Sequence, residues 1–246
     1  MMRPAAAVGI AAVAGTATAD VVDLIIFEVI ATNDLTGASQ TRTYTVDASA
    51  NAGDTIEWTL PDQLDFADIG GVASASVMVT TDGASRGASG AQSVVADFSV
   101  FASTQNASFQ INSAVVSFST IQASDALGFA SAAVTLVDVL NDGAALTPAP
   151  GGGYQALVNG GSTFASLFPA GSPLSVPSGT GTLDFNSDTG AFLPAGVDVS
   201  SISASWNFSL SGFDSATGTS TFTVIPAPAS AAMLGLGGLA AARRRR

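Results

Sequence analysis

The chain has 246 residues, contains no cysteine and no histidine, and all seven of its basic residues are arginine. Without histidine, lysine or cysteine it cannot form a disulfide, a Ser-His-Asp triad, a Cys-His pair or a Schiff-base lysine. All 19 acidic residues lie between residues 20 and 223, where Arg42 and Arg86 alone oppose them and the net charge is −17. A segment this acidic repels phosphates, so we expect no binding of nucleic acid.

The first 19 residues have the composition of a secretory signal peptide. Arg3 precedes an uncharged stretch of small residues, which ends in the small-x-small sequence Ala17-Thr18-Ala19. This pattern predicts export and cleavage before Asp20. Residues 1–19 are a poor core strand, because only small side chains would face the core.

Residues 20–223 are predicted to form one acidic β-domain. Helical periodicity is nearly absent, and short apolar-polar alternations are separated by Gly, Ser, Asp and Pro. These patterns favour an antiparallel β-sandwich or jelly roll. Strands are expected over residues 21–31, 41–46, 56–60, 73–81, 94–102, 107–121, 129–140, 154–158, 162–167, 202–210 and 219–224.

Several connections have signatures of their own. The alternation in residues 107–121 changes phase near residue 114, which predicts a β-bulge. Residues 82–90 have the composition of a flexible loop, and Asn141-Asp-Gly143 predicts a turn. Residues 202–210 and 219–224 are expected to pair as a hairpin. Residues 144–180, rich in proline and glycine, are expected to be the least regular part of the domain.

One acidic segment resembles a calcium-binding loop in composition. Asp184, Asn186 and Asp188 alternate before Gly190, and alternating oxygen ligands in a tight loop are typical of Ca²⁺ sites. The match is partial, because the glycine comes at the seventh position and no glutamate follows at the twelfth; a polar turn is the alternative. A second, similar cluster contains Asp62, Asp65 and Asp68.

Two functions that involve carbohydrate remain open on the residues. Glu28 and Glu57 are the only glutamates, and both lie in predicted strands; as an acid and a nucleophile they would make a carboxylate-based glycosidase. A carbohydrate-binding module would instead need exposed aromatic rings. The candidates for such rings are Trp58, Tyr44 and Tyr154.

The C-terminal segment, residues 224–246, has the composition of a sorting or anchoring signal. The fourteen residues 229–242 are uncharged, and counting back through Val224 gives nineteen before the four arginines 243–246. A membrane-spanning helix needs about 20 apolar residues. Each arginine costs about 2.5–3.5 kcal/mol at the centre of a bilayer. The segment therefore predicts a hydrophobic helix that enters the membrane, with Arg243, Arg244, Arg245 and Arg246 held on the cytoplasmic side.

This tail resembles the PEP-CTERM sorting signal of Gram-negative bacteria with exopolysaccharide-rich surfaces. Pro226, Ala227 and Pro228 stand where that family has Pro-Glu-Pro, followed by the hydrophobic segment and the basic end. The resemblance implies processing by an exosortase-like membrane protease. It also implies delivery to the cell surface or extracellular matrix, with transient or permanent membrane anchoring. We therefore expect an exported, non-enzymatic surface protein; the alternatives are a carbohydrate-binding module associated with exopolysaccharide, and a glycosidase.

Overall fold

The computed structural model describes most of the predicted β-domain. The described residues are 24–47, 55–58, 64–66, 75–86, 91–113, 115–178 and 181–227. They contain strands and no helix, and the strands pair antiparallel. The predicted signal peptide, residues 1–19, lies outside the described residues. So does all of the predicted C-terminal segment, residues 224–246, except its first four residues, of which residues 224–226 belong to a strand and not to a helix.

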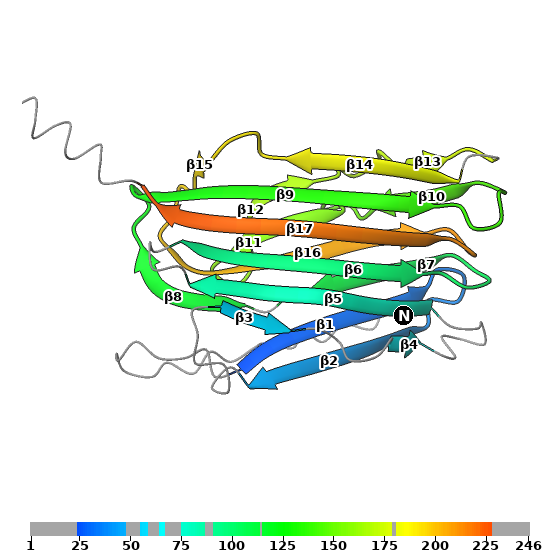
Figure 1. Ribbon diagram of the computed structural model, residues 1–246, viewed down its shortest axis with the longest axis horizontal. Coiled ribbons are helices and arrows are strands. Elements are labelled where there is room, and N and C mark those ends of the chain that lie inside the picture. The colour runs from blue at the N-terminus through cyan, green and yellow to red at the C-terminus, as the bar shows by residue number, and fades with distance from the viewer. Residues whose placement is uncertain are drawn as a thin grey trace, which may run out of the picture.

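The strands form two sheets that lie one behind the other (Figure 1). The nine-stranded sheet follows the order β12 (Ser162–Leu167), β11 (Tyr154–Val158), β16 (Val199–Leu210), β7 (Ala107–Asn112), β1 (Leu24–Asn33) and β2 (Ser39–Asp47). Three short strands also pair within it: β8 (Val116–Ile121), β10 (Ala144–Pro148) and β13 (Leu174–Val176).

The eight-stranded sheet is the nearer one in Figure 1. Its order is β14 (Thr182–Asp188), β9 (Ala126–Val137), β17 (Ser215–Pro226), β6 (Gln92–Phe101), β5 (Ala75–Arg86) and β3 (Thr55–Trp58). Two short strands, β15 (Leu193–Pro194) and β4 (Leu64–Phe66), pair with β9 and β5. The described domain is thus an antiparallel β-sandwich, as the alternation predicts.

The core lies between the two sheets, because alternate residues of each strand turn inward. Along β6 and β9 every second side chain is buried. Aromatic rings bridge the layers: Phe98 of β6 lies 5.0 Å from Trp206 of β16 between ring centroids, and Phe164 of β12 lies 5.3 Å from Phe222 of β17. Burying such large side chains is the main favourable term in folding this cysteine-free chain.

The polar atom of the central tryptophan has a partner inside this core. The Trp206 indole Nε1 donates a hydrogen bond to the Ser220 hydroxyl at 3.1 Å, and that hydroxyl donates to the Ala96 carbonyl at 3.2 Å. Because a buried donor without an acceptor costs about 1–3 kcal/mol, Ser220 allows a tryptophan to occupy the centre of the sandwich. The chain of bonds links β16 to β17 and β6 across the two sheets.

The expected hairpin between the last two long strands is wrong. β16 lies in the nine-stranded sheet and β17 in the eight-stranded one. β7 and β8 occupy one edge of β16, while β11 and β10 occupy the other, so no edge is left for β17. The connection over residues 211–214 instead crosses between sheets, and the two apolar faces meet across the core.

Two further sequence predictions have definite outcomes. The extra residue predicted near residue 114 agrees with the pairing on either side of it: from Asn112 to Val116 the chain advances four residues, while their partners on β16, Ser205 and Ile202, are three apart. Residue 114 itself lies outside the described residues. The flexible loop expected from residue 82 is wrong in its first part. β5 continues through Arg86, because β3 and β6 pair with it on both sides.

Gly218 on β17 provides a test of this packing. An added Cβ there would meet the Phe98 ring, with the nearest atom 2.3 Å away. Gly218→Ala should therefore displace Phe98 from its contacts with Trp206 and Phe208, and lower the free energy of unfolding by about 1–3 kcal/mol in denaturant titrations. Thr217→Ser, on the exposed face of the same strand, should change it by less than about 0.5 kcal/mol. Equal stability of the two variants would contradict the placement of Phe98.

Candidate functional sites at the two ends of the sandwich

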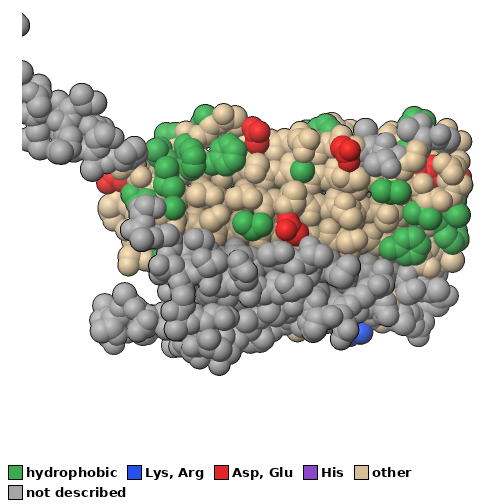
Figure 2. All heavy atoms as spheres, in the orientation of Figure 1, with side chains coloured by type: hydrophobic (Ala, Val, Ile, Leu, Met, Phe, Trp, Pro, Cys, Tyr) green, Lys and Arg blue, Asp and Glu red, His purple; other side chains and the backbone are tan. Residues whose placement is uncertain are grey.

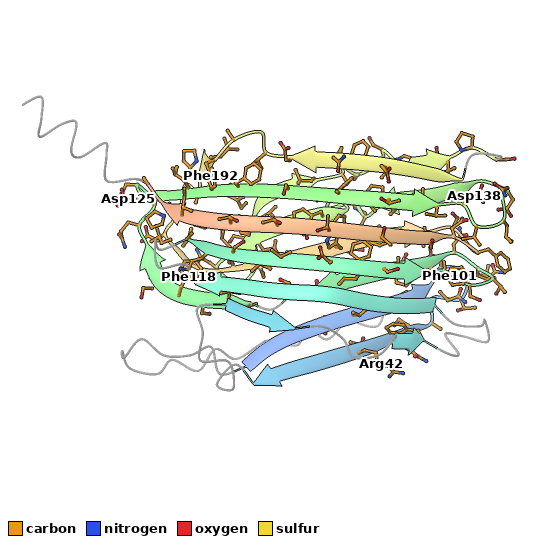
Figure 3. All side chains as sticks on the ribbon, viewed as in Figure 1. Arg42, Phe101, Phe118, Asp125, Asp138 and Phe192 are labelled. Carbon is orange, nitrogen blue, oxygen red and sulfur yellow. The ribbon has the colours of Figure 1, made fainter. Side chains whose placement is uncertain are left out.

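β17 joins the two regions of functional interest. It lies between β9 and β6 and pairs with β9 along its whole length, from Ser215 opposite Val137 to Pro226 opposite Ala126. Its ends therefore lie at opposite ends of the sandwich, as the labels of Asp125 and Asp138 on either side of β9 mark in Figure 3. We call the end near Pro226 the tail end and the end near Ser215 the acidic end.

At the tail end the strand extends further than the sequence indicates. β17 runs through Pro226, and the Ala227 backbone N–H donates a hydrogen bond to the Asp125 carbonyl. The expected domain boundary after residue 223 thus falls inside a paired strand. Val224 is fully buried, at 0 % exposure. The first two residues of the Pro226-Ala227-Pro228 motif therefore belong to the end of the sandwich. Pro228 and the arginines 243–246 lie outside the described residues.

An apolar patch lies on the outer face of the eight-stranded sheet near the tail end. The Phe129 and Phe192 rings are 5.5 Å apart, and Phe192 and Leu193 are 43 % and 45 % exposed. Phe129 pairs with Thr223 of β17, which places the patch beside the last residues of that strand. In Figure 2 the described surface between the two ends consists mainly of backbone and uncharged polar side chains with few acidic groups, and a second group of hydrophobic side chains lies at the other end.

At the acidic end, three carboxylates come together from two connections. Asp138 follows β9 and Asp214 precedes β17, so the pairing of Val137 with Ser215 brings them side by side. Asp142 joins them from the β9–β10 connection. One carboxylate oxygen from each residue lies within 4.8 Å of the others.

The β9–β10 connection is shaped to hold these groups close. The Asp138 carboxylate accepts hydrogen bonds from the backbone N–H groups of Asp142, at 3.2 Å, and Gly143, at 2.8 Å. Asn141 and Gly143 have φ values of 59° and 103°, which fold the chain back on itself. The turn predicted for Asn141-Asp-Gly143 is confirmed.

The three neighbouring carboxylates repel one another when all are ionised. Burial raises the pKa of the Asp214 carboxyl; hydrogen bonds from Ser211 and the Val139 backbone oppose the rise, and the neighbouring Asp138 and Asp142 add to it. A raised pKa means that the folded state holds this proton more tightly than the unfolded state. This contribution to stability is present at low pH and is lost as the pH rises through the raised pKa.

The segment 184–188, for which the sequence leaves a calcium loop and a polar turn as alternatives, is a strand. Asp184, Asn186 and Asp188 lie on β14, opposite Thr135, Ala133 and Ser131 of β9. At about 3.3 Å per strand residue, Asp184 and Asp188 are about 13 Å apart along the backbone. The Asp184 carboxylate accepts a hydrogen bond from the Thr135 hydroxyl at 2.6 Å. The extended spacing does not gather these three side chains around one ion.

The other predicted site residues do not converge either. Glu28, on β1, accepts a hydrogen bond from the Asn112 amide at 3.0 Å and belongs to the nine-stranded sheet, whereas Glu57, on β3, belongs to the eight-stranded one. Tyr154 is completely buried against Trp206, so the prediction that it is an exposed sugar-binding ring is wrong. Asp62 and Asp68 lie outside the described residues, as do Ala17, Ala19 and Asp20.

The acidic cluster was not among the predicted sites, although part of its signal is local. Asp138 and Asp142 stand four apart with Gly143 next, a spacing that the turn interpretation covers equally well. Asp214 gives no local signal, because it joins the cluster only through the pairing of β9 with β17.

No family model matches the chain, and no curated protein matches it. Two solved structures, of the infectious bursal disease virus Gt and Gx strains, align over 87 % and 85 % of the chain with 13 % and 11 % identity and TM-scores of 0.15 and 0.10. The chain spans 63 % and 66 % of those two chains. Such low TM-scores support no inference about fold or function. Within the described residues, no helix is long and apolar enough to span a membrane.

The burial of Tyr154 leads to a prediction that separates core packing from sugar binding. Tyr154→Ala should lower the free energy of unfolding by about 3–5 kcal/mol, as large-to-small aromatic changes in cores do. Burial raises the pKa of the Tyr154 hydroxyl and the Ser220 hydroxyl opposes the rise, so Tyr154→Phe should cost at most about 1.5 kcal/mol. Chemical denaturation followed by tryptophan fluorescence measures both. A fully stable Tyr154→Ala protein would show that the ring is not in the core.

Proposed function

We propose that the protein is an exported, non-enzymatic cell-surface or extracellular-matrix protein. In this proposal residues 1–19 direct export, and the segment that begins with Pro226-Ala227-Pro228 directs sorting by an exosortase-like membrane protease. The β-sandwich is the cargo, which is retained at the surface or released among extracellular polysaccharide.

The observation that supports this most strongly is the direct continuity of β17 with the tail. The Ala227 backbone N–H donates a hydrogen bond to the Asp125 carbonyl at the end of the sandwich. The proposed sorting motif ends one residue later, so no linker separates the domain from the signal. A pull on the tail acts along β17, which is hydrogen-bonded to β9 and β6 on both sides. To pull the strand out, the hydrogen bonds of both ladders must break at the same time. The domain therefore resists a force applied through the tail, as a tethered domain must.

The geometry also favours brief membrane contact over permanent anchoring. Val224 and Ile225 are paired in β17, so they are not available to lengthen the apolar segment. The uncharged run that remains, residues 229–242, has fourteen residues, short of the roughly 20 needed for a full span. Cleavage after Pro228 would remove this segment and leave every pair of β17 intact.

A non-enzymatic role is consistent with the composition of the surfaces. The outer face of the nine-stranded sheet has a row of cross-strand neighbours: Glu28, Asn112, Ser205 and Gln155. Asn112 accepts a hydrogen bond from Ser205 at 2.7 Å and donates one to Glu28. On β17, threonines 217, 219, 221 and 223 alternate outward. Such polar faces with few charges stay hydrated, and the chain has no histidine, lysine or cysteine to serve as a nucleophile or base.

Removal of the tail provides the test. The full-length protein and a variant that ends at Ala227 are expressed in a Gram-negative host with an exosortase, each with an epitope in the exposed turn at Gly160-Gly161. We expect the product of the full-length gene at the cell surface, accessible to protease on whole cells and without the segment after Pro228. The truncated protein, which lacks the segment that directs it to the membrane protease, should remain between the two membranes. Replacement of Arg243, Arg244, Arg245 and Arg246 by serine should reduce delivery to the surface in the same way.

The melting temperature of the truncated protein serves as the control. It should equal that of the full-length sandwich, because every strand of the described fold is retained. Recovery of the full-length epitope from the cytosol, or an unchanged distribution after truncation, would contradict the proposal.

A second candidate, polysaccharide binding, now depends on the apolar patch at the tail end. Exposed aromatic rings offer flat apolar surfaces to sugar rings. The Phe192 ring is exposed beside the half-buried Phe129 ring, whereas Tyr154 is buried. Affinity electrophoresis in exopolysaccharide gels measures this. If the module binds, Phe192→Ala should abolish retardation and Phe213→Ala, an equally exposed ring at the acidic end, should not. Equal mobility of all three proteins with and without polysaccharide would exclude the candidate.

A further inference from the structure

We propose that Asp138, Asp142 and Asp214 form a Ca²⁺-binding site at the acidic end of the sandwich. The site lies between the β9–β10 connection and the β16–β17 connection, at the opposite end of β17 from the sorting motif. It does not depend on the sorting proposal, since it is defined by the fold alone.

The spacing of the carboxylates fits one ion. Calcium binds oxygen at 2.3–2.6 Å, so ligands on opposite sides of it are about 5 Å apart. One oxygen from each of the three residues lies within 4.8 Å of the other two. Three carboxylates from two separate connections could therefore share a single cation without rearrangement of the strands.

An unsatisfied buried oxygen points independently to a ligand. Asp214 is 0 % exposed, and its Oδ1 has no hydrogen-bond partner, whereas Oδ2 accepts one from the Ser211 hydroxyl. A buried polar atom without a partner is uncommon in a stable protein and indicates that a water, a proton or an ion binds there. A cation near Oδ1 would supply what this carboxylate lacks.

Among the described side chains, the neighbours of Asp214 include no positive charge that could play this role. The groups that act on its pKa are Ser211, Val139, Asp138 and Asp142, and none of them is basic. Two buried carboxylates, Asp138 at 4 % and Asp214 at 0 % exposure, lie beside a third that is exposed. Burial of like charges together is costly unless a counter-ion is present.

The ligand set selects a hard cation, and the shape of the site favours calcium. The chain has no histidine or cysteine, so soft and borderline metals lose their preferred ligands. Mg²⁺ demands a near-ideal octahedron, whereas Ca²⁺ accepts irregular arrangements of six to eight oxygens. The cluster is built on irregular connections, and exposed Asp142 leaves one side open for entry and for water ligands.

Binding would add a link at a junction where Ser211 already exchanges hydrogen bonds with Ala145 of β10. Asp138 follows β9, and Asp214 is the last residue of the connection, residues 211–214, that leads from β16 in one sheet to β17 in the other. An ion bound by all three residues would hold the β16–β17 connection and the β9–β10 connection together. The expected consequence is a calcium-dependent gain in stability that is concentrated at the acidic end.

The direct test is thermal unfolding of full-length protein, purified in detergent and stripped with EDTA, as CaCl₂ or MgCl₂ is added. At a Ca²⁺ concentration about 100 times the Kd, the melting temperature should rise by about 5 °C, and Mg²⁺ should produce a smaller rise. Isothermal titration calorimetry should give one site. Absence of both heat and a shift in melting temperature would overturn the proposal.

Three variants distinguish this site from general attraction of cations to an acidic protein. Asp142→Asn, at an exposed position, should keep the metal-free melting temperature and weaken Ca²⁺ binding at least tenfold. Asp214→Asn should raise the metal-free melting temperature by removing a buried like charge, and should abolish the calcium shift. Asp188→Asn, in the β14 segment, should respond to calcium as the unmodified protein does.

Other outcomes would contradict the assignment. An equal calcium shift in Asp142→Asn and the unmodified protein would mean that binding is diffuse. Loss of the shift in Asp188→Asn alone would place the ion on β14. A metal-free Asp214→Asn protein that is less stable, with its calcium shift intact, would make Asp214 only a structural hydrogen-bond acceptor.

Discussion

The contact between β16 and β17 across the core is the constraint on which the rest of the structure depends. Both strands alternate apolar and polar residues, and each fills the centre of its own sheet. Trp206 meets Phe98 above Gly218, and its indole N–H is satisfied by Ser220. Because these two strands are adjacent in sequence but belong to opposite layers, the short connection between them fixes how the sheets lie on each other.

The position of β17 also explains why both regions of functional interest are linked. The strand begins directly after a buried aspartate and ends at Pro226, the first residue of the proposed sorting motif. A force on the tail and an ion at the acidic end would therefore act on the same strand. In an exported protein, where calcium is available outside the cell, an ion that braces the far end of the tethered strand would reinforce the whole sandwich.

Local pattern was enough to predict most of the longer strands, but not short ones such as β10 and β13, which lie in the segment expected to be least regular. It also failed where distant strands decide the outcome. Residues 154–158 and 162–167 are predicted with the bounds that β11 and β12 have, because alternation and flanking glycines are visible in a short window. The hairpin of residues 202–224 is wrong because neighbours far away in sequence fill both edges of β16. Asp184, Asn186 and Asp188 alternate as well on a strand as in a loop, and pairing with β9 selects the strand. Asp214 joins Asp138 and Asp142 only because β17 pairs with the other edge of β9.

The most direct test of the account is the intact mass of the protein recovered from the cell surface. The account predicts a chain that begins at Asp20 and ends after Pro228, with all of β17 retained and the segment through Arg246 removed. A chain of full length recovered from the cytosol, or a surface form cut within residues 215–226, would contradict it.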